Sequence, residues 1–303
     1  MPNTLAHIAV SRLLLSRFSS YSDILLIYIG CIIPDLPWIM QRILHSTTNT
    51  DPFDLRLYAI AQASLFMCII ISCVIACVMR SPIKAALLLI SGSLVHLLLD
   101  ATQTKWANGV HLLAPFDWSL INFGLYWPES NITYFLTFAG FIALVINLKP
   151  MITNAIPLVF STRRLGISAA LILTYMLAPL LLLEQIERSG SHYVDTLRDS
   201  ENRTQKQIEI DRVTLLMSNS GDYTIKTFGN NKFILKNIAP QLETPATISL
   251  KGNFIDNHTI QVNEYHLHNK TMRDGATLLG LSLILFITIG QLIQAARKHH
   301  LDR

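Results

Sequence analysis

The sequence predicts an α-helical polytopic membrane protein of about six membrane helices, with a small all-β insert of the OB-like type. Its 303 residues are 51% hydrophobic and only 15% charged, with a mean hydropathy of +0.40. A soluble domain usually carries about 25% charged residues. Several apolar runs approach the roughly 20 residues that a helix needs to cross a bilayer. Residues 187–272 instead alternate polar and apolar side chains, the period of β-strands.

The first apolar segment, residues 4–18, is too short to span, so we expect it to be interfacial or re-entrant. Residues 22–40 can span, but Pro34 and Pro37 flank Asp35 and are expected to break the helix near its far end. A polar loop is expected over 41–57. Further membrane helices are expected over 58–79, 83–100, 131–148, 165–185 and 275–295. Residues 101–130 read as a loop rich in Trp, Asn, Pro and Phe.

The predicted domains are a helical membrane domain (1–186), a small extracytoplasmic β domain (187–272) and a last membrane helix with a cytoplasmic tail (273–303). Turn-forming residues separate five alternating runs in the β domain, which favours a small sandwich or an OB-like barrel. The runs are 207–213, 223–228, 232–235, 246–250 and 259–265.

Lysine and arginine counts in the short loops set the orientation, because cytoplasmic loops are enriched in both. One side of the predicted membrane has eight lysine and arginine residues: Arg80, Lys84, Lys149, Arg163, Arg164, Arg297, Lys298 and Arg303. The other has three: Arg42, Arg56 and Lys105. We therefore expect a bacterial inner (cytoplasmic) membrane protein whose β domain lies outside and whose C-terminus is cytoplasmic. The net charge of +4, without a basic stripe, argues against a nucleic-acid partner.

Ionisable residues gather at one predicted depth. His96 and Asp100 are one helical turn apart at the outer end of an apolar run. Asp35 lies about 18 Å along its helix from the inner end, near the same level. His111 follows in the outer loop. A lone histidine on such a helix is more often a hydrogen-bonded core residue, but a buried carboxylate needs a partner, and together these residues favour a metal site.

Imidazole and carboxylate without thiolate favour zinc, with manganese or iron as alternatives. Zinc with an open coordination position activates water for attack on an ester or phosphodiester. The four cysteines fall in apolar runs without zinc-knuckle spacing, so we expect free, buried thiols.

Four short motifs occur in order within residues 1–148, and together they resemble the bacterial membrane-bound metal-dependent hydrolase family, which has been likened to zinc-dependent phospholipase C. They are Asn3-Thr4-Leu5-Ala6-His7, Pro34-Asp35, His96-x-x-x-Asp100 and Gly109-Val110-His111-Leu112-Leu113-Ala114-Pro115-Phe116. The resemblance implies that His7, Asp35, His96 and Asp100 are metal ligands. The sequence departs from the family pattern at 41–48, which has one histidine and no His-Arg pair.

The remaining candidates are peripheral. Lys105 and Asn108 could bind a phosphate or a polar head group, with interfacial anchoring as the alternative. Asp54 is a substrate-binding candidate whose alternative role is in a helix cap or turn. His266 and His268 are expected on the solvated surface of the β domain.

Two functions compete. The first is a membrane-embedded hydrolase, with Asp35, His96 and Asp100 as catalytic residues and His7 and His111 as further metal ligands, acting on a membrane lipid or lipid-linked phosphoester. The alternative is a non-catalytic envelope protein whose β insert binds a saccharide or protein partner.

Overall fold

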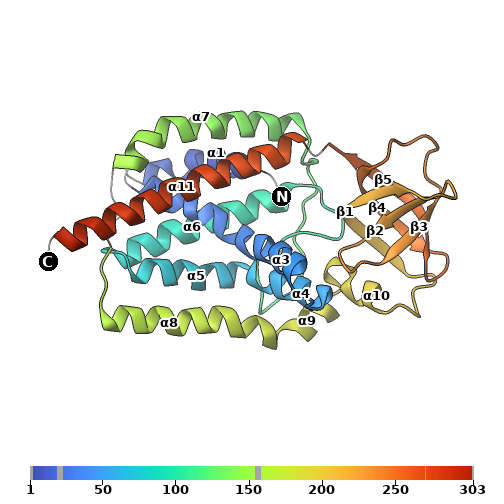
Figure 1. Ribbon diagram of the computed structural model, residues 1–303, viewed down its shortest axis with the longest axis horizontal. Coiled ribbons are helices and arrows are strands. Elements are labelled where there is room, and N and C mark those ends of the chain that lie inside the picture. Colours follow the sequence, from blue (N-terminus) through green and yellow to red (C-terminus); the bar gives the residue numbers. More distant parts are fainter. Residues whose placement is uncertain (1–2, 19–22, 154–157, 270, 302–303) are drawn as a thin grey trace.

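The computed structural model describes residues 3–18, 23–153, 158–269 and 271–301; Arg303, which entered the charge count, lies outside them. A bundle of helices occupies one end of the molecule and a β-barrel the other (Figure 1). Among the described residues, five helices are long and apolar enough to cross a membrane, or six if one bent helix pair counts as a single span. The five are Ile24–Thr47, Pro82–Thr102, Asn131–Thr153, Thr162–Leu181 and Arg273–Ala295. The prediction of a mostly helical chain with a β insert is therefore confirmed.

Most of the bundle helices lie near their predicted places. They are α2 (Ile24–Ile32), α5 (Leu65–Cys77), α6 (Pro82–Thr102), α7 (Asn131–Thr153), α8 (Thr162–Leu177) and α11 (Thr271–Leu301). Residues 101–130 contain no helix beyond the end of α6, as expected. The cysteines are free, and Cys31 and Cys68 are buried.

The expected polar loop at 41–57 is wrong. A short 3-10 turn, Ile33–Asp35, leads directly into α3 (Leu36–Thr47), and α4 (Pro52–Gln62) follows it. Pro34 and Pro37 stand at the first positions of the turn and of α3, where a missing N–H leaves no helical hydrogen bond unmade. The chain therefore bends without losing its helical course.

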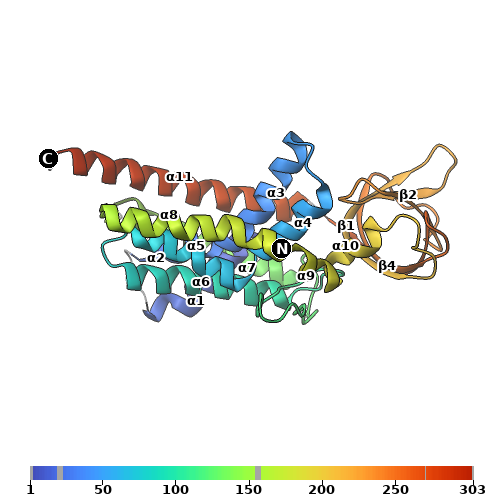
Figure 2. The ribbon, with the colours of Figure 1, turned by 90° about the horizontal axis from the view of Figure 1, so that it is seen from below.

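The single helix expected over 58–79 is also wrong. Helices α4 and α5 meet at an angle of 70°. Ser64 stands at the break, and its side chain accepts a hydrogen bond from the backbone N–H of Met67 as the N-cap of α5. The bend turns α3 and α4 toward the barrel (Figure 2).

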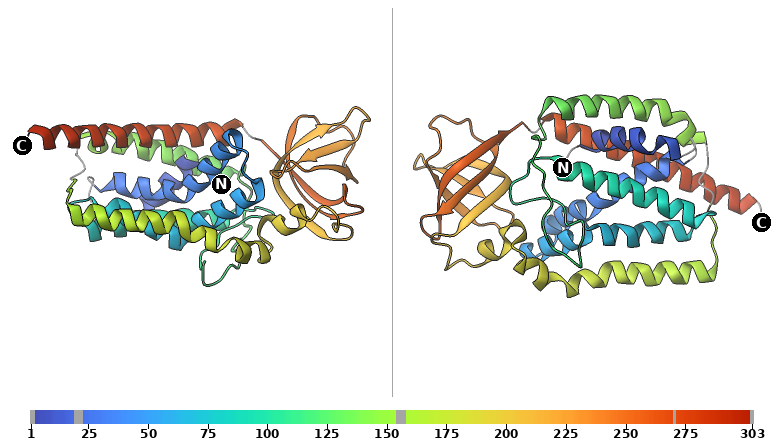
Figure 3. Two further views of the ribbon diagram at one scale, coloured as in Figure 1. Left: turned by 60° about the horizontal axis from the view of Figure 1, so that its bottom comes forward. Right: turned by 180° about the vertical axis from the view of Figure 1, so that it is seen from behind.

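Helix α1 (Thr4–Leu15) is buried in the bundle along most of its length. It begins at the barrel end of the bundle and packs against α7 (Figure 3). A Cβ at Gly140 of α7 would lie 1.7 Å from the carbonyl oxygen of Leu5, so only glycine permits this approach. The first turn of α1 thereby reaches the end of α6.

The insert forms a closed five-stranded barrel in the order β1-β2-β3-β5-β4, which confirms the five predicted strands. They are β1 (Gln207–Met217), β2 (Tyr223–Lys226), β3 (Lys232–Lys236), β4 (Ala246–Phe254) and β5 (Thr259–His268). Short helices α9 (Leu183–Arg188) and α10 (Val194–Arg198) lead into it.

The barrel and the α3–α4 hairpin are packed together. Phe53, Leu57 and Ile60 of α4 belong to the same buried apolar cluster as the barrel core. Strand β1 carries a bulge between Ile210 and Val213, where Arg212 has a left-handed backbone with φ of 54°. A bulge redirects a side chain out of the strand pattern, and here it redirects Arg212.

Candidate metal centre

The local structure that holds His96 comes from a close helix pair. A Cβ at Gly30 of α2 would lie 2.3 Å from the carbonyl oxygen of Leu89, and one at Gly92 of α6 would lie 2.4 Å from that of Ile27. This contact brings His96 Nδ1 to 2.5 Å from the carbonyl oxygen of Cys31. A carbonyl only accepts, so Nδ1 carries the proton and Nε2 presents a lone pair, as in many metal-bound histidines.

His7 reaches the same place from α1. Asn3 caps this helix by accepting from the backbone N–H of Ala6 at 2.9 Å, and its amide donates to the Thr137 hydroxyl of α7 at 2.6 Å. The rings of His7 and His96 are stacked, with centroids 3.7 Å apart. Both residues are only 1% exposed.

Two carboxylates complete the cluster. Asp35 Oδ1, in the turn after α2, lies 3.4 Å from His96 Nε2. Asp100, one turn beyond His96 on α6, places Oδ1 3.5 Å from His7 Nε2 and Oδ2 3.9 Å from His96 Nε2. The Lys105 ammonium lies 3.0 Å from Asp100 Oδ2 and is buried with it.

The polar atoms of this cluster are buried but lack hydrogen bonds. Both ring nitrogens of His7, Asp35 Oδ1, His96 Nε2 and Asp100 Oδ1 have no partner. Each such atom costs about 1–3 kcal/mol of stability. One imidazole offers a single nitrogen to a given ion, so four of these atoms, one on each residue, indicate a missing shared partner rather than poor packing.

The donor set fits a divalent metal. His7, His96 and Asp100 each offer a ligand atom within 4.8 Å of the other two, and Asp35 joins through His96. Metal–ligand bonds of about 2.0–2.2 Å in a tetrahedral site put ligand atoms roughly 3.3–3.6 Å apart. The contacts of 3.4 and 3.5 Å match that spacing, which is long for a hydrogen bond. A cavity of about 30 Å³ beside His96 and Asp100 has room for a water.

His111 lies at the edge of this cavity, outside the ligand cluster. Its Nδ1 donates to the carbonyl oxygen of Trp118 at 2.9 Å, and its Nε2 accepts from the Ser191 hydroxyl at 2.9 Å. Both nitrogens are thus engaged, and burial lowers its pKa. The structure therefore places His111 in the lining of the same cavity as His96 and Asp100, but not among the potential metal ligands.

The three predicted substrate-binding residues do not lie at one site. Lys105 and Asn108 both line a larger cavity that also reaches Asp100. Asp54 pairs with Arg198 of α10 at 2.6 Å and joins α4 to the approach to the barrel. Asp54 is therefore placed by a structural ion pair.

His192 is a site residue that the sequence did not suggest. It is buried, lines the small cavity with His96 and Asp100, and accepts from Arg56 at 3.0 Å. Burial and the adjacent guanidinium hold its pKa well below the usual value, so it is neutral. The left-handed backbone at His192 (φ 53°) has no signature in the Ser-His-Tyr sequence.

A second group of potential metal ligands lies between the loop before α7 and the barrel, comprising Glu129, His266 and His268. Arg212 already fills it, because its Nη1 lies 2.7 Å from Glu129 Oε1 and 3.0 Å from His268 Nδ1. We therefore interpret it as an ion-pair network. The expected solvated surface position is wrong for His268, whose side chain is 1% exposed. His266 is partly exposed, with 29% of its side chain accessible, and stacks on Trp127 at 3.8 Å.

No protein-family model, curated protein or solved structure matches this chain. The resemblance to membrane-bound metal-dependent hydrolases therefore stays a prediction from short motifs. The geometry of the cluster carries the functional argument.

Proposed function

We propose that this chain is a multi-pass protein of the bacterial inner membrane and a metal-dependent hydrolase that cleaves a phosphoester in an amphiphilic substrate at the outer face. The observation that carries the proposal is the set of five buried, unpartnered atoms on His7, Asp35, His96 and Asp100. Three separate elements deliver these side chains, which is more than a local ion pair would require.

Two features support the membrane placement. Large apolar side chains remain exposed on the outer helices, such as Phe135 at 69% and Phe286 at 75%. The ends of α6, α7 and α8 that lie opposite the barrel (Figure 1) carry Lys84, Lys149, Arg163 and Arg164, and Arg80 lies just before α6. The positive-inside rule makes that end cytoplasmic and the barrel, which we take to be OB-like, extracytoplasmic.

A bound divalent ion would supply Lewis acidity and an activated water. The chain's own residues do the rest. The Cys31 carbonyl orients His96, and the Lys105 ammonium balances Asp100 and adds positive charge where a phosphoester would gain negative charge. Burial of all four ligands shields the site from bulk water.

Metal analysis of the purified full-length protein tests this proposal. We expect stoichiometric zinc, manganese or iron in the native protein and its loss in His96→Ala and Asp100→Asn. His258→Ala, which removes an exposed barrel histidine, is the matched control and should keep the metal. A native protein that is folded and free of divalent metal after purification without chelators would overturn the proposal.

A further inference from the structure

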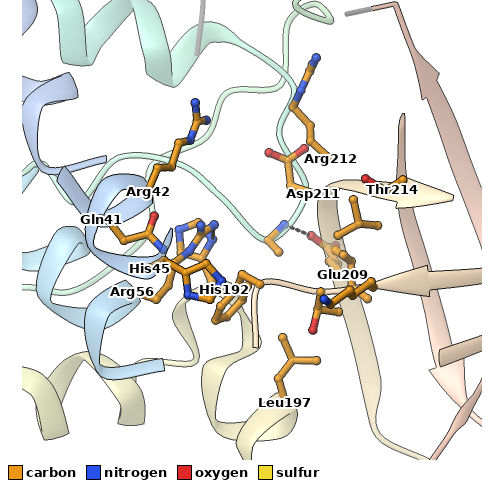
Figure 4. A pocket seen from close by; sticks show the side chains of 16 residues that line it. Gln41, Arg42, His45, Arg56, His192, Leu197, Glu209, Asp211, Arg212 and Thr214 are labelled. Atoms are coloured by element: carbon orange, nitrogen blue, oxygen red, sulfur yellow. Dashed lines mark hydrogen bonds between the residues drawn. The ribbon is translucent and has the colours of Figure 1, made fainter. Parts of the chain in front are cut away.

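A chamber lies between the α3–α4 hairpin and strand β1 of the barrel, beside the place where the two pack together. It consists of two cavities of about 350 and 340 Å³ that share Gln41, Arg42, Arg56, Asp211 and Arg212. Figure 4 shows Arg42 and Arg56 on the helical side and Asp211 and Arg212 on β1. Each volume is at the lower end of the range for small-molecule sites.

Positive charge dominates where the two cavities meet. Among the shared residues, three are arginines and one, Asp211, is a carboxylate. Glu129, outside the cavity lining, pairs with Arg212 at 2.7 Å, so the excess is one positive charge. The Ser249 hydroxyl donates to Asp211 at 2.7 Å. Farther out, Lys105 pairs with Asp100, Arg273 with Asp274 and Lys251 with Glu209, so those charges offset one another.

Arg42 and Arg56 lack such neutralisation. Within the described part of the chain, neither has a carboxylate oxygen within ion-pair distance. Arg56 instead lies over the ring of Trp38 at 4.9 Å and donates to the neutral His192. Arg42 is exposed toward the chamber mouth.

Two guanidinium N–H groups in the chamber wall are buried and unused. Arg56 Nε and Arg212 Nη2 have no hydrogen-bond partner. Arg212 is brought here by the bulge in β1, and its other terminal nitrogen is held by Glu129 at 2.7 Å. Guanidinium donors in a fixed planar array match the oxygens of a phosphate group.

The chamber also opens toward the metal centre. Asp100 and Lys105 line the same cavity as Arg42, Arg56 and Arg212. An anionic group held by these arginines would therefore be adjacent to the carboxylate that we propose as a metal ligand. The metal centre and the chamber arginines could therefore contact the same substrate molecule.

We infer that this chamber binds an anionic, phosphate-bearing head group through Arg42, Arg56 and Arg212. The inference rests on the proposed hydrolase function and assigns the residues that would hold the phosphate of its substrate. The barrel is then a wall of the substrate site, because it supplies Arg212 and Asp211.

Calorimetric titration of the purified full-length protein in phosphatidylcholine nanodiscs with inorganic phosphate tests the inference. We expect saturable binding that weakens at least about tenfold in Arg42→Gln/Arg56→Gln and is unchanged in Lys232→Gln, an exposed barrel lysine. The single variant Arg42→Gln changes an exposed residue, so it should fold normally, and it should weaken phosphate binding by several-fold. No saturable binding in the native protein, or native-like binding in the double variant, would overturn it.

Two further arms separate the possibilities. Nanodiscs doped with phosphatidate should compete with inorganic phosphate if the head group comes from a lipid, whereas absence of competition assigns a soluble phosphate ester. His96→Ala should lose metal yet keep phosphate binding, and the arginine variants should show the reverse. If phosphate binding disappears in His96→Ala, the phosphate binds at the metal, and the inference about the chamber is overturned while the hydrolase proposal stands. If the native protein is metal-free but binds phosphate, only the hydrolase proposal is overturned.

Discussion

At the scale of single residues, Lys105 has the most specific electrostatic role. Its ammonium is 4% exposed and lies 3.0 Å from Asp100 Oδ2, so one positive charge already balances one of the two buried carboxylates. A cluster of two neutral imidazoles, Asp35, Asp100 and Lys105 has a formal charge of −1. A divalent ion would change this to +1, which suits an anionic substrate.

This balance predicts the behaviour of Lys105→Met. Removing one partner of a buried ion pair typically costs about 3–5 kcal/mol of stability. A bound metal still neutralises Asp100, so we expect a smaller loss with metal present than after chelation. Thermal unfolding of the solubilised protein, with and without chelator, measures both.

The double variant Lys105→Met/Asp100→Asn provides the control. It leaves no uncompensated charge at this pair, so it should be more stable than Lys105→Met after chelation. Equal losses for Lys105→Met in the two conditions would show that Asp100 does not contact a metal.

At the scale of elements, the site depends on helices held close by glycine. Gly140 admits α1 beside α7 and so positions His7, while Gly30 and Gly92 admit α2 beside α6 and position His96. None of these residues touches the candidate ligand atoms. These glycines therefore act on the site only through the spacing of the helices that carry His7 and His96.

Gly140→Ala should consequently displace α1 and reduce metal content, because its Cβ would overlap the Leu5 carbonyl. Gly166→Ala on α8 is the matched control, since a Cβ there meets nothing within 4 Å. Alanine in an exposed helix position is better than glycine by about 0.5–1 kcal/mol, so the control should be neutral or slightly more stable. Elemental analysis and thermal unfolding of both variants compare them; equal metal content in the two would refute the geometric role of Gly140.

Elements also show how far sequence reasoning extends. Apolar runs and alternating runs predict most helices and all five strands, because burial imposes the 3.6 and 2.0 periods directly. The 70° bend at Ser64 escapes because a lone serine within the mainly apolar stretch 59–71 gives no turn signal. His7, Asp35, His96 and Asp100 were found from depth and motif, whereas Arg56, His192 and Arg212 reach the site through a hairpin, a left-handed turn and a bulge that leave no periodic trace.

At the scale of the whole molecule, an apolar contact and an ion-pair network help to hold the barrel against the bundle. The α4 side chains extend the barrel core on one side. On the other, Glu129 before α7 binds Arg212 of β1 and His268 of β5, and these contacts lower its pKa from 4.5 to about 2 despite its burial. Since the barrel supplies one wall of the chamber, its attachment governs access to the site.

The lowered pKa of Glu129 makes the attachment acid-sensitive. A carboxyl whose pKa is depressed in the folded state stabilises that state above its unfolded pKa, and the stabilisation is lost as the pH falls from about 4.5 toward about 2. The contribution of Glu129 to docking should thus be constant from pH 7 to 5 and weaken below 4.5. Tryptophan fluorescence can follow the docking of the barrel, because Trp127 stacks on His266 of β5.

Glu129→Gln should lower the thermal midpoint at pH 7 and remove most of this pH response. Glu243→Gln, in the connection between β3 and β4, is the control and should behave as the native protein. An unchanged acid transition in Glu129→Gln would show that Glu129 does not govern the acid response of the barrel.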